Sequence, residues 1–263
     1  MKVKANYHSH VAVCNHAEGT PKDHVKRMIE LGYNIIGISD HIPLPVYDNF
    51  PPEWVLMYRM KESDLEGYLE ELRECKSLYK DSAKILIGLE AEYWDSHLEW
   101  LKTLSLKTDY LVFGNHDIVV DGCLISSFGL TKKAEVIEYG RSTVEAFSTG
   151  LYAFMAHPDL YLMKYPWDET AKEVAHVIAK ASIKYDIPLE LNANGIRRGL
   201  VETTEGLRYM YPRKEFWEII RHYNCEVIIN SDAHYLNQHD DKELRKAYEL
   251  GQEWGLNIID SLE

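Results

Sequence analysis

The sequence predicts an α/β protein: a single-domain, distorted (β/α)7 barrel, TIM-barrel-like, that takes in all of residues 1–263. Short apolar runs alternate with longer amphipathic stretches from end to end, which is typical of repeated βα units and not of a sandwich or a helix bundle. The length fits one domain, because α/β barrels commonly take about 250 residues. Hydrophobic residues form 46% of the chain, which is enough for one large core.

The strands of this barrel are predicted from seven short apolar runs. Each run is bounded by polar residues and has the length of a buried strand. In chain order the predicted strands are Val3–Tyr7, Ile35–Ser39, Ile85–Leu89, Tyr110–Phe113, Ala153–Met155, Leu189–Asn192 and Val227–Asn230.

Helical patterns lie between these runs. The first helix opens at Thr20, a good N-cap residue, followed by Pro21, which suits the first helical turn. The other predicted helices are Ser63–Tyr79, Lys132–Ser148, Asp168–Tyr185, Arg213–His222 and Lys242–Trp254.

Two stretches, Pro43–Met60 and Asn194–Tyr211, fit no βα repeat. The first is rich in proline and aromatic residues, and the second carries Arg197 and Arg198 between two glycines. Both follow the carboxyl end of a predicted strand, where barrel enzymes place their substrate loops. We expect them to form part of a binding site.

The composition limits the possible partners. A formal charge of −13 argues against a broad nucleic-acid or anionic-membrane surface, because such surfaces need patches of Lys and Arg. No apolar run reaches the roughly 18 residues of a membrane span, and the N-terminus lacks the apolar core of a signal peptide, so we expect a cytoplasmic protein. The four cysteines form no CxxC pair and are predicted to be free thiols, mostly buried.

Histidines gather at the ends of the predicted strands. Seven of the twelve lie at or just beyond a strand's carboxyl end, and Glu90 and Asp232 occupy such ends too. In a barrel all these ends meet on one face, so residues distant in sequence become neighbours. The seven are His8, His10, His16, His41, His116, His157 and His234. The other five, expected in helical or polar surface stretches, are His24, His97, His176, His222 and His239.

Each of these residues taken alone has an ordinary explanation. The pair His8 and His10 could be incidental, His41 could cap or pack, and Glu90 and Asp232 could be salt-bridge partners. Together they favour a metal site, because unrelated histidines would not choose the same end of nearly every strand. Imidazole and carboxylate ligands without thiolate suit Zn, Mn or Fe, and nine ligands would serve two or three divalent metal ions with open positions.

The order of these residues resembles the polymerase and histidinol phosphatase (PHP) family. The resemblance is carried by His8-Ser9-His10, Ser39-Asp40-His41, Gly88-Leu89-Glu90, Gly114-Asn115-His116, Ala156-His157-Pro158 and Ser231-Asp232-Ala233-His234. The chain length and the loop that ends in Gly195-Ile196-Arg197 resemble the histidinol-phosphatase branch in particular.

The resemblance implies a trinuclear centre. One metal would be held by His8, His10, Glu90 and Asp232; a second by Glu90, as a bridge, with His116 and His157; and a third by His16, His41 and His234. The implied reaction is hydrolysis of L-histidinol phosphate to L-histidinol and inorganic phosphate in histidine biosynthesis, by a hydroxide that bridges two metals. The catalytic residues would be Glu90, Asp232 as a proton shuttle, and Arg197 as a bidentate clamp on the phosphoryl group.

The part of the substrate beyond the phosphoryl group also needs residues that line its binding pocket. Asp48, Trp54, Tyr58 and Arg59 in the Pro43–Met60 loop are candidates, although they could equally form an ordinary packed loop. Other functions stay open: a PHP-type nucleotide phosphatase or nuclease, or a noncatalytic metal-binding domain. The charge of −13 favours a small phosphorylated substrate over nucleic acid.

Overall fold

The fold is built on one sheet of parallel strands. The computed structural model describes residues 4–45 and 51–262. Every neighbouring pair in the sheet is parallel, as expected for strands joined by helical crossovers. In sheet order the strands are β1 (Ala5–Asn6), β2 (Ile35–Ile38), β3 (Lys84–Ala91), β4 (Tyr110–Phe113), β7 (Tyr152–Met155), β8 (Leu189–Asn192), β11 (Glu226–Asn230) and β12 (Asn257–Ile258).

The sheet curls until β1 approaches β11. Just beyond these strands, Ser9 and Ala233 form a parallel bridge. Side chains also join the two segments: the Tyr7 amide donates to Asn230 Oδ1 at 2.8 Å, and the Ser231 amide donates to Asn6 Oδ1 at 2.7 Å. The first and seventh predicted strands therefore meet, and the expected distorted barrel is confirmed.

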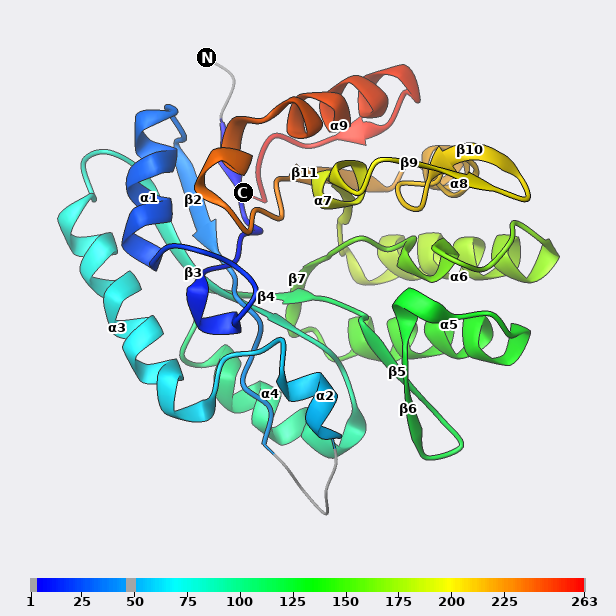
Figure 1. The fold of residues 1–263 in the computed structure, drawn as a ribbon, viewed down its shortest axis with the longest axis horizontal. Helices are drawn as coiled ribbons and strands as arrows, with labels where there is room; N and C mark the ends of the chain where they lie inside the picture. The colour runs from blue at the N-terminus through cyan, green and yellow to red at the C-terminus, as the bar shows by residue number, and fades with distance from the viewer. Residues whose placement is uncertain (1–3, 46–50, 263) are drawn as a thin grey trace.

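Helices lie around the outside of the curled sheet (Figure 1). Thr20 and Asp23 form a reciprocal capping box at the start of the first helix, and Asp168 and Asp241 cap two later ones. These outer helices are α1 (Pro21–Glu30), α3 (Glu62–Leu78), α4 (Leu98–Ser105), α5 (Lys133–Ser148), α6 (Glu169–Tyr185), α8 (Lys214–Tyr223) and α9 (Lys242–Glu253). Short 3-10 turns cover Ala12–Cys14, Asp95–His97, Ser127–Gly129, Leu160–Leu162 and Leu236–Asp240.

The structure confirms the predicted strands and helices to within two residues at each described end; Val3 lies outside the described residues. Elements that the sequence did not reveal are α4, β12 and two hairpins, β5–β6 (Asp117–Val120 with Cys123–Ser126) and β9–β10 (Leu200–Thr203 with Gly206–Tyr209). Short helices α2 (Glu53–Leu56) and α7 (Ala193–Arg197) occupy the two loops that fitted no repeat.

The expectation about the cysteines is met. The four cysteines are free, and only Cys123 among them is exposed. Within residues 4–45 and 51–262, no helix combines the length and hydrophobicity that crossing a membrane would require.

Candidate metal centre

A cavity of about 330 Å³ opens at the carboxyl ends of the strands. Strands β1, β2, β4, β7 and β11 each lead directly into a segment that supplies ligand candidates, and β3 supplies Glu90 from within the strand. The structure brings all nine predicted ligands together here, most of them buried. The cavity is lined by His10, His16, His41, Trp54, Val55, Tyr58, Arg59, Glu90, His116, Asp117, Ser126, Phe128, His157, Asn194, Arg198, Tyr211, Asp232 and His234.

Glu90 lies at the middle of this cluster, and its two oxygens face different imidazoles. Oε1 lies 3.2 Å from Nε2 of both His116 and His157 and 3.5 Å from His8 Nε2. Oε2 lies 3.1 Å from His41 Nδ1 and 3.6 Å from His10 Nε2. Glu90 therefore turns its two oxygens toward two different sets of imidazoles.

Asp232 belongs with the two histidines of the first strand. Its Oδ1 lies 3.1 Å from His10 Nε2 and 3.7 Å from His8 Nε2, and the two Nε2 atoms are 3.2 Å apart. The other oxygen, Oδ2, accepts a hydrogen bond of 3.0 Å from Asn192 Nδ2. One oxygen is therefore held by the protein while the other faces the cluster.

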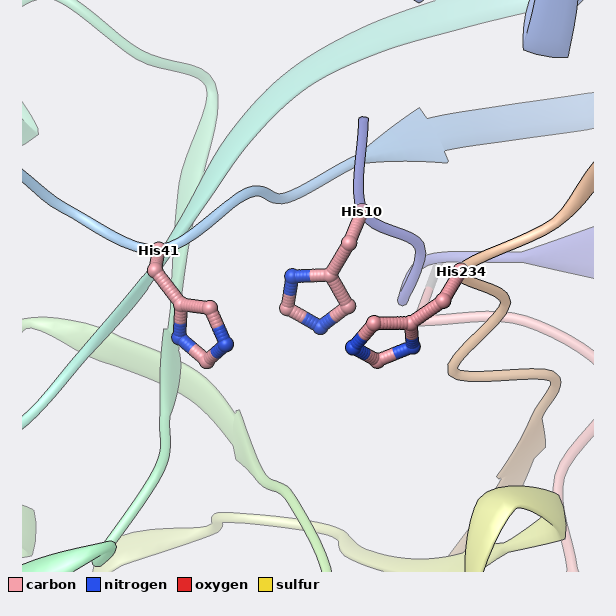
Figure 2. A group of neighbouring side chains, drawn as sticks. All are labelled: His10, His41 and His234. Atoms are coloured by element: carbon pink, nitrogen blue, oxygen red, sulfur yellow. The ribbon is translucent and has the colours of Figure 1, made fainter. Parts of the chain in front are cut away.

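A third group consists of imidazoles. Figure 2 shows the rings of His10, His41 and His234 arriving from three separate segments and pointing into one region. The His16 ring lies 5.2 Å from that of His41 and 4.8 Å from that of His234, centroid to centroid. Because His16 Nδ1 donates to Cys14 O at 2.9 Å, its Nε2 is the nitrogen left for a ligand.

These residues fit metal ions rather than a closed hydrogen-bond network. Both oxygens of Glu90, Oδ1 of Asp232 and Nδ1 of His41 are buried with no hydrogen-bond partner among the described residues. Buried polar atoms without partners are rare and costly. Two ligand atoms that bind one Zn²⁺ tetrahedrally, each about 2.1 Å away, lie about 3.4 Å apart. The separations of 3.1–3.7 Å match that spacing, so the centre suits several divalent metal ions.

Three buried carboxylates accept hydrogen bonds from the imidazoles on the side away from the centre. His8 Nδ1 donates to Glu190 at 2.8 Å, and His116 Nδ1 donates to Glu92 at 2.5 Å. His10 Nδ1 donates to Asp40 at 3.2 Å. Each contact occupies the outer nitrogen and directs Nε2 to the centre, as outer-shell carboxylates do for metal-bound histidines.

Sequence reasoning missed these carboxylates, although weak signals existed. Glu190 lies within the buried strand β8, Glu92 directly follows β3, and Asp40 directly precedes His41. A charge in a strand buried on both faces needs a partner.

The pKa directions follow from this crowding. Burial raises the pKa of Glu90, but the imidazoles of His116, His8 and His41 outweigh it and hold the pKa well below its ordinary value. Asp232 behaves in the same way, with its pKa lowered by His8 and His10 against the effect of burial. Burial lowers the pKa of His234 to about 3, so its ring is a neutral donor of a lone pair.

The backbone is also adapted to the centre. A Cβ added at Gly114 would lie 2.5 Å from Glu90 Oε1 and 2.5 Å from His116 Cε1, so only glycine leaves room there. His157 and Asp232 have φ of 31° and 45°, in a region that L-residues rarely occupy. Such strain costs about 1–3 kcal/mol per residue and tends to occur at functional sites.

The predicted phosphate clamp, Arg197, does not line the cavity. Its Nε donates to Asp241 at 2.6 Å, and its Nη atoms donate to the carbonyl oxygens of Ser231 and, at 3.0 Å, Gln238. The short helix α7 turns Arg197 toward the loop after β11 and leaves the next residue, Arg198, in the cavity lining.

Arg198 has the exposure and setting that were expected of its neighbour. Its guanidinium lies over the rings of Phe128 and Tyr211, at 5.5 and 5.8 Å from their centroids, and Nε donates to Tyr211 Oη at 3.3 Å. Nη1 and Nη2 make no hydrogen bond to other described residues, so they can reach a ligand.

The predicted wall of the cavity is present in part. Trp54 and Tyr58 line it and are partly exposed, whereas Asp48 lies outside the described residues. Arg59 lines it too, but is buried and donates to Glu92 at 2.5 Å. Its main effect is therefore on the carboxylate that holds His116.

The expectation about the remaining histidines was wrong for three of them. His24, His97 and His239 are buried, and only His222 is fully on the surface, with His176 in between. A position in a polar or helical stretch does not show which way a ring points, and each buried ring packs inward with hydrogen-bond partners.

The fold and the site together define the class: an α/β-barrel protein with a multi-ion metal centre at the carboxyl ends of its strands. The PHP domain matches residues 6–194, and the chain belongs to this family.

A curated relative, the "Probable histidinol-phosphatase" of Schizosaccharomyces pombe, is 26% identical over 250 residues, which cover 86% of this chain and 79% of the relative. Two solved structures share the fold. The putative histidinol phosphatase of Listeria monocytogenes has a TM-score of 0.74 and 20% identity, covering 91% of this chain and 98% of its own. The histidinol phosphate phosphatase of Lactococcus lactis, complexed with Zn, L-histidinol and phosphate, has a TM-score of 0.70 and 19% identity, covering 97% and 95%.

Proposed function

We propose that this protein is a metal-dependent phosphomonoesterase that hydrolyses L-histidinol phosphate to L-histidinol and inorganic phosphate. The observation that carries the proposal is Glu90, whose two oxygens face separate groups of imidazoles in a cavity that is also lined by the Arg198 guanidinium. Relatives named histidinol-phosphatase match most of the chain and support this choice of substrate.

The ligands divide into three adjoining groups, two of which share Glu90. We assign one ion to His8, His10, Glu90 and Asp232, a second to Glu90, His116 and His157, and a third to His16, His41 and His234. Divalent Zn, Mn or Fe would acidify water and neutralise phosphoryl charge there.

The protein's own groups would act at both ends of the reaction. Water attacks phosphorus, the bond from phosphorus to the alcohol oxygen breaks, and that oxygen takes up a proton. Asp232 would accept the proton from the attacking water and pass it on. This role is supported by its two oxygens, one of which is held by Asn192 while the other faces the cluster. Arg198 takes over the phosphoryl-binding role expected of Arg197, since its planar fork suits two phosphoryl oxygens.

The same proposal includes the whole chain as one PHP-type domain, a small-molecule substrate and a cytoplasmic location. One large hydrophobic core joins residues from Val11 to Leu256, in keeping with a single domain. A nucleotide phosphatase or nuclease is the second candidate within the family, and the net charge of −13 counts against long nucleic acids.

An assay panel combined with metal analysis tests the proposal. We expect two to three equivalents of Zn, Mn or Fe per chain, and kcat/KM for L-histidinol phosphate at least 10-fold above those for p-nitrophenyl phosphate, nucleoside monophosphates and single-stranded DNA. Less than one equivalent of metal in active protein would contradict the multi-ion centre. A nucleotide as the best substrate would move the protein to the second candidate function.

A further inference from the structure

Asp117 is a cavity residue that the reaction outlined above does not use. It begins strand β5, directly after His116, and pairs in register with Ser126, another lining residue. The residue is 5% exposed. Trp94 Nε1 donates to its main-chain oxygen at 3.1 Å, which fixes the backbone and leaves the carboxylate to face other partners.

The carboxylate of Asp117 has no hydrogen bond from any residue that the structure describes. Among the described residues its one ion-pair partner is Arg59, whose Nη2 lies 3.6 Å from Asp117 Oδ2 but only 2.5 Å from Glu92 Oε1. The stronger contact of Arg59 is therefore with Glu92. One guanidinium facing two carboxylates leaves negative charge in the cavity wall, and the Asp117 carboxylate lines the cavity, where it can take a further partner.

The surroundings indicate what that partner would be. Trp54, Tyr58 and Phe128 line the same cavity and offer aromatic faces, which attract cations and cover small organic groups. Arg198, which lies over Phe128, supplies positive charge to the same space. The cavity therefore contains a cationic group suited to phosphate and an anionic group suited to a positive charge on the rest of the substrate.

We propose that Asp117 binds the ammonium group of the leaving alcohol, which makes it a specificity residue for phosphate esters of small amino alcohols. This rests on the proposed function and deepens it: the metal centre and Arg198 bind the phosphoryl group that all monoesters share, and Asp117 selects among alcohols. A charge-assisted hydrogen bond from the ammonium to this carboxylate would supply the missing partner.

The test compares the unaltered enzyme with the Asp117→Asn variant on two substrates. L-Histidinol phosphate is compared with 3-(imidazol-4-yl)propyl phosphate, the same ester without the amino group. Asp117→Asn keeps the size of the side chain and removes its charge. Asp121→Asn, at the exposed turn of the same hairpin, is the matched control. Metal content is measured for each protein.

We expect Asp117→Asn to lower kcat/KM for L-histidinol phosphate by at least 10-fold, mainly through KM, and to change it less than 2-fold for the ester without the amino group. Asp121→Asn should change neither. Equal losses on both esters, or no loss on either, would overturn the assignment of Asp117.

A measurement on the unaltered protein covers the case in which the variant folds poorly. L-Histidinol should compete with substrate at least 10-fold more tightly than 3-(imidazol-4-yl)propan-1-ol, and equal inhibition would also overturn the assignment. Failure of the proposed function looks different. In that case the unaltered enzyme would show no preference for L-histidinol phosphate over p-nitrophenyl phosphate, whatever Asp117→Asn does.

Discussion

At the residue scale, the adjacent residues Arg197 and Arg198 have different roles: Arg197 supports a loop, and Arg198 is the proposed phosphate-binding residue. Arg197 holds carbonyl oxygens of the loop that carries Asp232 and His234, and its side chain is mostly buried. Arg198 keeps its two Nη atoms available at the cavity. Substitutions at these neighbouring positions should therefore fail in different ways.

We predict that Arg198→Ala lowers kcat/KM by about 10²-fold with metal content unchanged, the scale of losing one well-placed electrostatic donor. Arg198→Lys should recover part of the loss, since a point charge cannot reproduce the fork. Arg197→Ala should instead lower the denaturation midpoint and metal content together, because the loop after β11 loses its ties. Steady-state kinetics with metal analysis distinguishes these outcomes, and an unimpaired Arg198→Ala enzyme would rule out the phosphate role.

The sequence could predict which histidines would meet, but not which arginine would face them. Proposed ligands such as His8, Glu90 and Asp232 lie at or just beyond the carboxyl ends of strands, and the barrel itself brings these ends together. The orientation of residues 197 and 198 depends instead on the five-residue helix α7, capped by Asn192. A helix that short has no apolar period long enough to detect, and successive side chains point about 100° apart.

At the element scale, the strands of the barrel were predictable because each is a compact apolar run. The hairpins β5–β6 and β9–β10 were not, since their residues are mostly half-exposed and lack a clear alternation. The sequence also did not predict the contact between α1 and the loop after β11. His24 Nε2 donates to Glu18 O at 2.8 Å, so His24 Nδ1 must accept from His239 Nε2, also at 2.8 Å.

This histidine pair joins two segments that carry proposed metal ligands, because Glu18 lies two residues after His16 and the Glu18 amide donates to His234 O at 2.9 Å. We predict that His239→Ala lowers the free energy of unfolding by about 2–4 kcal/mol, since it leaves a cavity and an unpaired nitrogen on His24. His222→Ala, on the surface, should change it by less than about 0.5 kcal/mol. Chemical denaturation of both variants is the measurement, and equal stability would refute the structural role of the pair.

At the scale of the whole molecule, the metal centre lies where the barrel is otherwise weakly joined. Strand β1 is two residues long, and one bridge with a few side-chain hydrogen bonds connects its end to that of β11. The proposed ligands come from segments on both sides of that junction: His8 and His10 from one, Asp232 and His234 from the other. Ions held between them would connect the segments after β1 and β11 and offset the mutual repulsion of Glu90 and Asp232.

We therefore predict that removing metal destabilises the entire barrel. A ligand that binds only the folded state at about 1,000 times its Kd adds about 4 kcal/mol, and for a domain of this size each kcal/mol shifts Tm by about 2–4 °C, so chelation should lower Tm by about 10 °C or more. Adding Zn²⁺ or Mn²⁺ should restore it. Glu90→Gln supplies the control, because losing the bridging carboxylate weakens two ion sites at once, and its Tm should respond far less to chelator. The measurement is a thermal melt monitored by circular dichroism. The contrary result is a wild-type Tm that does not change on chelation even though metal analysis shows that the metal has been lost. That result would mean that the barrel closes without help from the centre.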